Sequence, residues 1–468
     1  MITTMGDTFI ETLASAVEEA KKGHRVAVSR TVPLAGISPL HFFAAAGDAF
    51  SGERTFWMPP ESDTVLAGAG NEWIIDTDEA SNSRFMDIEK EWKRFKFIRD
   101  ADSPSPVLMG GFSFDPLKNS SADWTSYKNG RFTLPKYLCR WERGKKPEVT
   151  ICKVLNGEES FIEAEADFLG RIRYIESLVK KSGVASGNPA PFEMMEHHTD
   201  DWLHSIIEAT AAIKEGQLDK VVLAREISMK SDEPIDVRSA LDTLIKEQQT
   251  SFRFVIENGS SSFIGATPER LIKIQDRFMQ SACLAGTIKR GSSKKEDRAL
   301  ENSLLNDQKN LEEHAYVVKM IREALQEHSS ELMIPENPGI YKTKNVQHLF
   351  TPIEGSLSED SSLLHIVRQL HPTPALGGLP QQKALEMIRD LEPMERGWYA
   401  APVGWMDAEG NGEFAVAIRS ALVKDHSAVL YAGCGIVKDS IPEMEYEETK
   451  IKLRPMLSAL GGLKYDRS

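Results

Sequence analysis

Acidic residues near the C-terminal end of the sequence have a spacing that could hold a metal ion. In PEMEYEETKIK (442–452), Glu445, Glu448 and Lys452 lie three and four positions apart, so they share one face of a helix. The stretch NLEEHAYVV adds Glu313 from a second helical segment. Carboxylates from two helices commonly hold a hard cation such as Mg²⁺, with water and substrate oxygens completing the shell. A solvated row of ion-paired side chains has the same spacing, so the pattern alone leaves both interpretations open.

The elements that must position these residues follow an α+β pattern. Strands come in runs that look antiparallel, and helices are grouped between them. Apolar spacing predicts helices over 7–22, 84–97, 158–182, 201–216, 236–249, 295–327 and from 442 onward. Alternating or β-rich runs predict strands at 25–30, 55–60, 64–70, 107–114, 132–141, 149–155, 220–229, 252–257, 261–267, 270–275, 278–287, 398–407, 413–423 and 429–437.

The length of 468 residues exceeds what one ordinary hydrophobic core supports. Gly, Ser and Pro crowd together in SGVASGNPAP, a composition typical of connections. We therefore expect an N-terminal mixed α/β region over 1–190 and a second region over 191–468. Apolar residues make up 41% of the chain and charged residues 27%, as in ordinary globular proteins.

Charge and motif content exclude several classes of function. The net charge of -14 argues against nucleic acid or an anionic membrane surface as a partner. The sequence contains no G-x-x-x-x-G-K-[ST] loop, no H-E-x-x-H pair and no G-x-S-x-G elbow. Its four cysteines show no C-x-x-C pairing. Neither a signal peptide nor an apolar run of membrane-spanning length is present, so we expect a cytoplasmic protein.

Ten motifs together resemble the chorismate-binding enzymes, and they occur in that family's order. The family includes isochorismate, salicylate, anthranilate and aminodeoxychorismate synthases. The resemblance implies antiparallel β-sheets packed as a sandwich-like core with helices outside, with the N-terminal region interwoven with the rest. The motifs are KVVLAR (220–225), ATPER (266–270), ACLAGT (282–287), NLEEHAYVV (310–318), VQHLF (346–350), LHPTPALGG (370–378), WYAAPVGW (398–405), FAVAIRSA (414–421), AGCGIV (432–437) and PEMEYEETKIK (442–452).

The resemblance also implies roles for individual residues. Lys220 matches the base that activates water, and Glu269 matches the acid that protonates the departing hydroxyl of chorismate. Glu313 and Glu448 match the Mg²⁺ ligands, with Glu445 as a further ligand or a holder of metal-bound water. The matched substrate-binding positions are Gly286, Thr287, His348, Ala375, Tyr399, Arg419, Gly433 and Lys452.

Two residues, together with the length and one further motif, favour an isochorismate synthase among the members of the family. Enzymes of the family that use ammonia lack a lysine at position 220, so Lys220 favours water as the nucleophile and no obligate amidotransferase subunit. Ala375 is similar to the small residue of isochorismate synthases, whereas members that go on to eliminate pyruvate tend to carry Thr. The length and MGGFSFDP (109–116) resemble the menaquinone-specific isochorismate synthases. A siderophore-pathway isochorismate synthase, a salicylate synthase, an aminating synthase and a catalytically silent chorismate-binding protein are the alternatives.

Overall fold

The computed structural model describes residues 7–34, 36–101, 103–118, 121–180, 192–343 and 346–461. The expected boundary near 190 lies outside these residues. The helices are α1 (Asp7–Lys21), α2 (Pro39–Ala45), α3 (Gly47–Phe50), α4 (Arg84–Trp92), α5 (Phe161–Lys180), α6 (Thr199–Lys214), α7 (Val237–Glu247), α8 (Lys294–Leu305), α9 (Gln308–Gln326), α10 (Leu363–Leu370), α11 (Gln381–Leu391) and α12 (Pro442–Leu460).

The strands outnumber the helices among the described residues. They are β1 (Arg25–Pro33), β2 (Arg54–Met58), β3 (Thr64–Thr77), β4 (Phe95–Arg99), β5 (Val107–Phe112), β6 (Gly130–Glu142), β7 (Glu148–Leu155), β8 (Phe192–Glu196), β9 (Lys220–Ser231), β10 (Phe252–Asn258), β11 (Ser261–Thr267), β12 (Arg270–Gln275), β13 (Phe278–Lys289), β14 (Ser329–Met333), β15 (Gly339–Lys342), β16 (Val346–Leu357), β17 (Gly378–Leu379), β18 (Pro402–Asp407), β19 (Gly412–Val416), β20 (Ser420–Lys424) and β21 (Ser427–Ile436).

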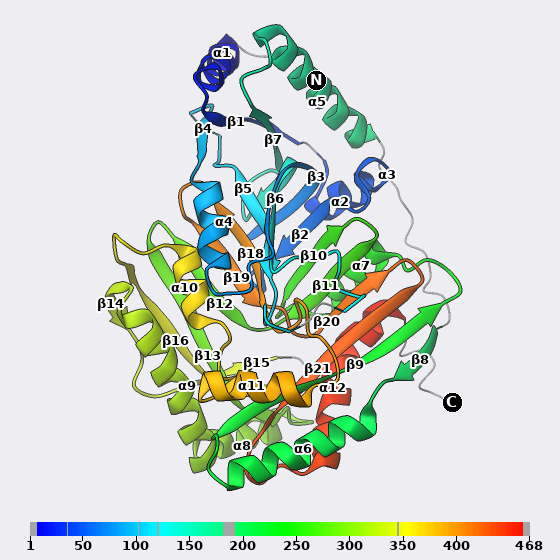
Figure 1. Cartoon of the computed structure of the whole chain (residues 1–468), viewed down its shortest axis with the longest axis vertical. Coiled ribbons are helices and arrows are strands. Elements are labelled where there is room, and N and C mark those ends of the chain that lie inside the picture. Colours follow the sequence, from blue (N-terminus) through cyan, green and yellow to red (C-terminus); the bar gives the residue numbers. More distant parts are fainter. Residues whose placement is uncertain are drawn as a thin grey trace.

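Most strands form one antiparallel path that passes through both sequence regions. The path runs β8, β9, β21, β20, β11, β10, β2, β3, β6, β5, β18, β19, β12, β13 and β16. The pairings β10 with β2 and β18 with β5 join strands from opposite sides of residue 190. Among the described pairings, only β1 with β4 is parallel. The N-terminal strands are therefore part of the same folded sheet as the C-terminal ones (Figure 1).

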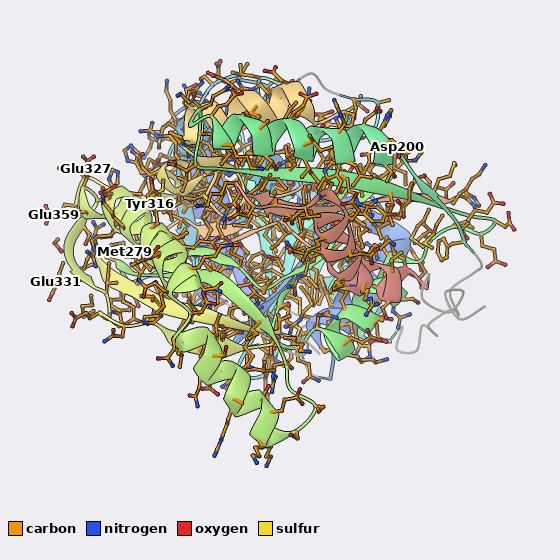
Figure 2. All side chains as sticks on the ribbon, turned by 90° about the horizontal axis from the view of Figure 1, so that it is seen from below. Asp200, Met279, Tyr316, Glu327, Glu331 and Glu359 are labelled. Carbon is orange, nitrogen blue, oxygen red and sulfur yellow. The ribbon has the colours of Figure 1, made fainter. Side chains whose placement is uncertain are left out.

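Helix α12 shows how packing orients the acidic residues. Its buried positions Thr449, Leu453, Met456 and Leu460 recur every three or four residues, and the apolar ones join a core that also contains Leu241 of α7. Because this face is turned inward, Glu445, Glu448 and Lys452 lie on an adjoining face. Helices α6 and α12 lie side by side on the underside of the molecule, where Asp200 marks the start of α6 (Figure 2). In the described part of the chain, no helix is long and apolar enough to cross a bilayer.

Two expected helices differ from the structure. The helix expected over 295–327 is wrong as one piece, because α8 ends before Asn306 and α9 begins after Asp307. The Asp307 carboxylate accepts a hydrogen bond from the Asn310 backbone N–H at 2.9 Å, which caps a new helix. The helix expected over 84–97 is also too long. It ends at Trp92, and the alternating run FKFIR pairs with β1 as strand β4.

A buried ion pair between Arg54 and Glu257 joins the two sequence regions. Arg54 Nη2 and Nε donate to the two Glu257 oxygens at 2.6 and 2.9 Å, and the Gly52 N–H donates to the same carboxylate at 3.0 Å. The Glu257 side chain is 3% exposed. The buried negative charge of Glu257 is therefore compensated by groups of the N-terminal region.

We predict that Arg54→Met lowers the free energy of unfolding by about 3 to 5 kcal/mol, because it leaves a buried carboxylate without its partner. Chemical denaturation of the variant measures this. The double variant Arg54→Met/Glu257→Leu should recover much of the loss, because it removes the stranded charge as well. A single variant as stable as the wild type would contradict the expectation.

Candidate active site

Lys220 is held at the start of β9 by strands on both sides. It pairs with Leu379 of β17, and the next residue, Val221, pairs with Ile436 of β21. A Cβ atom on Gly435 would lie 2.9 Å from Lys220 Cε, so the glycine makes room for the lysine side chain. Lys220 Nζ donates to Glu313 Oε1 at 2.8 Å, and its side chain is 14% exposed. This ion pair holds the lysine side chain against a carboxylate of α9.

Glu269 lies between β11 and β12, surrounded by cations. Burial raises the pKa of its carboxyl to about 7, while the charges of Lys220, Arg419 and Lys452 act in the opposite direction. A carboxyl group with this pKa is largely protonated at slightly acidic pH and can release its proton near neutrality. The structure thus brings Lys220 and Glu269, which are 49 positions apart in the sequence, into one electrostatic environment.

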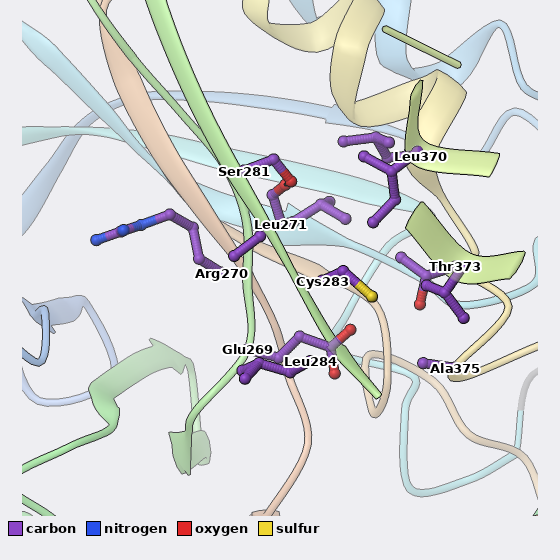
Figure 3. Close-up of a pocket in the computed structure, with 12 residues that line it drawn as sticks. Glu269, Arg270, Leu271, Ser281, Cys283, Leu284, Leu370, Thr373 and Ala375 are labelled. Carbon is purple, nitrogen blue, oxygen red and sulfur yellow. The ribbon is translucent and has the colours of Figure 1, made fainter. Parts of the chain in front are cut away.

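A small space beside the Glu269 carboxyl is lined by residues of the HPTPALGG motif. Glu269, Cys283, Thr373 and Ala375 line it, and the glutamate side chain extends toward Thr373 and Ala375 (Figure 3). Its volume of about 10 Å³ is close to that of one water molecule and too small for a ring-sized ligand. The Thr373 side chain lies close enough to the Glu269 carboxyl to lower its pKa, against the larger effect of burial. Ala375 therefore lies next to the acid rather than at a distance from it.

Arg419 supplies a positive charge with unused hydrogen-bonding capacity. Its φ of 50° places it in the left-handed region, which is uncommon for a residue with a side chain and costs of order 1 to 3 kcal/mol. Burial lowers the pKa of its guanidinium, opposed by the charge of Glu269. No described residue accepts a hydrogen bond from the Arg419 side chain, so its planar fork of donors is available to a carboxylate ligand.

His348 and Thr287 form a neutral polar pair near this arginine. Thr287 Oγ1 and His348 Nδ1 are 2.8 Å apart, across the pairing of β13 with β16. Burial, followed by the charges of Arg419 and Lys452, lowers the pKa of His348 to about 4, so the imidazole is neutral at pH 7. Its Nε2 atom is buried without a partner among the described residues.

Gly286 creates the local backbone shape that this pair requires. Its φ is 80°, and the register of β13 with β16 shifts between Leu284 and Thr287, which marks a bulge. A Cβ atom at Gly286 would lie 3.1 Å from Asn310 Oδ1. A residue with a side chain at this position would therefore be strained both in its backbone and against α9.

Tyr399 and Lys452 both contact β21, the strand that contains Gly433. Tyr399 is buried, and its ring stacks on Tyr431 with the centroids 5.4 Å apart. Lys452 Nζ donates to the Gly433 carbonyl at 2.9 Å and pairs with Glu448 Oε1 at 2.7 Å. The Gly433 backbone thus fixes the lysine that also influences Glu269 and His348.

The three candidate metal ligands are oxygen donors, which suit Mg²⁺. Glu313 is paired with Lys220, and Glu448 is paired with Lys452. Burial, followed by the nearby charge of Glu448, raises the pKa of Glu445. In the segments that the structure describes, no three His, Cys, Asp or Glu residues are gathered closely enough to form a metal site. A cation bound here would draw the carboxylates toward it and away from their lysines, and their role as ligands stays a prediction.

The arrangement as a whole combines an anion-binding side with an acid and an amine. Arg419 and Lys452 can attract a substrate with two negative charges, while Glu269 and Lys220 can exchange protons with it. Gly435 and Thr373 also contact this site, and we did not single them out from the sequence. Both lie inside the motifs AGCGIV and HPTPALGG, but only the structure shows the space beside Lys220 and the hydroxyl beside Glu269.

Comparison with known proteins identifies the family. The family model described as chorismate binding enzyme matches residues 11–461. The chain belongs to this family. It is 44% identical to isochorismate synthase MenF from Bacillus subtilis over 472 residues, covering 99% of each chain. It is 35% identical to the salicylate biosynthesis isochorismate synthase of Pseudomonas aeruginosa over 460 residues, covering 97% of this chain and 94% of that one. The resemblance predicted from the motifs is confirmed.

Solved structures of chorismate enzymes have the same fold. MenF, the menaquinone-specific isochorismate synthase of Escherichia coli, matches with a TM-score of 0.77 at 24% identity, over 96% of this chain and 100% of that one. Anthranilate synthase component I of Streptococcus pneumoniae matches with a TM-score of 0.69 at 21% identity, over 86% and 89%. The expected α+β fold of antiparallel sheets with outer helices is confirmed.

Burial of Glu269 gives the site a measurable stability cost. The folded pKa of about 7 exceeds the usual 4.5, so the folded state binds more protons between these values and stability falls as pH rises through this window. We predict that Glu269→Gln, which cannot ionise, is more stable than the wild type by up to about 3 kcal/mol at pH 8 in metal-free buffer, and shows little of this gain at pH 4.5.

Denaturant unfolding of both proteins at the two pH values measures the difference. Glu312→Gln, at an exposed position of α9, is the matched control and should change stability equally at both pH values. An equal effect of Glu269→Gln at pH 4.5 and pH 8 would show that Glu269 ionises normally.

Proposed function

We propose that this chain is an isochorismate synthase that uses Mg²⁺ to convert chorismate into isochorismate, by adding water at C2 while the C4 hydroxyl departs. The observation that carries the proposal is the placement of Lys220 and Glu269 in one site, with a lysine where a water-using enzyme of this family has its base. The 44% identity to the Bacillus subtilis isochorismate synthase over 99% of both chains supports the same reaction.

The two proton-transfer residues act at opposite ends of the reaction. Lys220 would take a proton from the water that attacks C2, and Glu269 would give a proton to the hydroxyl that leaves C4. Burial prepares Glu269 for this, because its raised pKa keeps a share of the carboxyl protonated near neutral pH. A lysine acts as a base through a free lone pair on its Nζ, whereas in the structure Lys220 Nζ donates a hydrogen bond to Glu313 Oε1 at 2.8 Å. The mechanism therefore requires Glu313 to turn away from the lysine during the reaction.

Binding of Mg²⁺ by Glu313 would explain why this carboxylate turns away from Lys220. Mg²⁺ held by Glu313 and Glu448, with Glu445 as ligand or water-holder, would polarise the ring carboxylate of chorismate. Arg419 and Tyr399 would hold the enolpyruvyl carboxylate, and Lys452 would lie near the carboxylate on the metal side. Gly286, Thr287, His348 and Gly433 would line the same site.

The pathway proposal rests on overall similarity. The 44% identity to the Bacillus subtilis enzyme MenF over 99% of both chains exceeds the 35% identity to the salicylate biosynthesis enzyme of Pseudomonas aeruginosa, which supports menaquinone biosynthesis over siderophore formation. We further propose that the protein acts in the cytoplasm on free chorismate, with water as the nucleophile and without an amidotransferase subunit.

Product analysis tests the reaction. We predict that the purified protein with chorismate and Mg²⁺ forms isochorismate without releasing pyruvate, and that added ammonium ions do not change the product. Lys220→Ala and Glu269→Gln should each lower turnover by about 10² to 10⁴-fold, because each removes one proton-transfer group. Liquid chromatography of the products measures both effects. Full turnover by Lys220→Ala would favour the aminating reaction instead, and pyruvate from the wild type would favour a salicylate synthase.

The position of Ala375 beside Glu269 generates a separate prediction. Thr at this position is typical of family members that go on to eliminate pyruvate, and its hydroxyl would enter the small space beside the acid. Ala375→Thr should therefore release measurable pyruvate while still forming isochorismate. A coupled lactate dehydrogenase assay detects the pyruvate. Ala375→Val, which adds similar bulk without a hydroxyl, should form none, and equal pyruvate from both variants would contradict a role for the hydroxyl.

A further inference from the structure

Arg225 is buried under α12, five residues beyond Lys220 on the same strand. The residue is 2% exposed, and its Nε donates to Thr449 Oγ1 of α12 at 2.8 Å. Its Nη1 donates to Glu196 Oε2 of β8 at 3.2 Å, and its guanidinium lies 4.5 Å from the ring centroid of Tyr446. One arginine of β9 therefore contacts two positions of α12 and the neighbouring strand.

The residues that contact Arg225 also form hydrogen bonds with one another. The Tyr446 hydroxyl donates to the same Glu196 oxygen at 2.7 Å, and Thr449 Oγ1 donates to the Tyr446 carbonyl at 2.7 Å. The Arg225 guanidinium also lies 5.9 Å from the Trp202 ring of α6, the helix beside α12 (Figure 2). The cation is thus held by hydrogen bonds, an ion pair and two aromatic rings.

The contacted residues alternate with the candidate metal ligands along the helix. Tyr446 directly follows Glu445, and Thr449 directly follows Glu448. Each residue turns the helix by about 100°, so fixing Tyr446 and Thr449 against Arg225 fixes the direction in which both carboxylates point. A small rotation of α12 about its axis would move Glu445 and Glu448 together.

Stability alone gives a weak reason for this arrangement. Replacing a buried ion pair by apolar residues of similar size is often neutral or stabilising. Arg225 Nη2 also remains without a partner among the described residues, which adds a cost to burying the cation. What an apolar side chain could not reproduce is the directional bond to Thr449 and the link through Glu196 to Tyr446.

We propose that Arg225 is a positioning residue that fixes the rotation of α12 and thereby holds Glu445 and Glu448 in the orientation that binds Mg²⁺. The inference rests on the metal site of the proposed function. Arg225 touches neither the metal nor the substrate, and acts through Thr449 and Tyr446. Substituting a residue that hydrogen-bonds directly to a metal ligand typically changes metal affinity 10 to 100-fold, and we expect Arg225, which acts through the helix, to fall at the lower end of this range.

The test measures Mg²⁺ affinity without substrate, by isothermal titration calorimetry of the full chain. Arg225→Lys keeps the charge but loses the planar fork and its two directional bonds. It should weaken Mg²⁺ binding at least tenfold, at a temperature where circular dichroism shows the wild-type fold. Tyr446→Phe keeps the ring and loses only the bond to Glu196, so it should weaken binding by a smaller factor and serves if Arg225→Lys does not fold.

The matched control is Arg171→Lys. Arg171 is another buried arginine, which is paired with Glu72 at 2.7 Å and with Asp167 at 2.5 Å. It lies in the N-terminal region, far from α12. This control should lower thermal stability and leave Mg²⁺ affinity unchanged. Wild-type affinity in a folded Arg225→Lys or Tyr446→Phe variant would overturn the inference alone. A wild-type protein that binds no Mg²⁺ would overturn the metal site of the proposed function and the inference with it.

Discussion

The pairing of β9 with β21 is the constraint on which the site depends. Ten consecutive residue pairs join these strands, from Lys230 opposite Ser427 to Val221 opposite Ile436. A shift of one residue would turn every side chain of β9 to the opposite face. Such a shift would remove Lys220 from the space left by Gly435 and Arg225 from its contacts with α12. The register of one ladder therefore fixes the proposed base and the proposed anchor of the metal-binding helix together.

Charges that are costly to bury are brought together by elements from distant parts of the chain. Glu269, Lys220, Arg419 and Lys452 come from four different segments and influence one another through space. Their mutual compensation is incomplete, because burial still raises the pKa of Glu269 to about 7. The strained backbone of Arg419 adds to this cost. A fold that only optimised stability would neutralise these groups or expose them, so the site is maintained at the expense of stability.

The sequence predicted the parts of this structure that depend on local pattern. The strand KVVLAREISM and the final helix from Pro442 lie where their periodicity placed them. The break at Asn306 and Asp307 was missed because the apolar spacing continues across it, while a single cap decides the boundary. The strand FKFIR was missed because its five residues are too few to distinguish from the end of a helix, and its pairing with β1 decides the outcome.

For the site, the motifs identified the residues but not their partners. Sequence order could not show that Lys220 pairs with Glu313, because their separation of 93 positions carries no information about their distance in space. The same holds for Arg225, which is one letter of the motif KVVLAR until the structure places Thr449 and Tyr446 beside it. A motif records which side chains are present, whereas the protonation state and direction of each depend on neighbours from other segments. This is why Lys220, predicted as a base from its position in the sequence, is found in the structure donating a hydrogen bond to Glu313, a carboxylate that would have to move before the lysine could accept a proton.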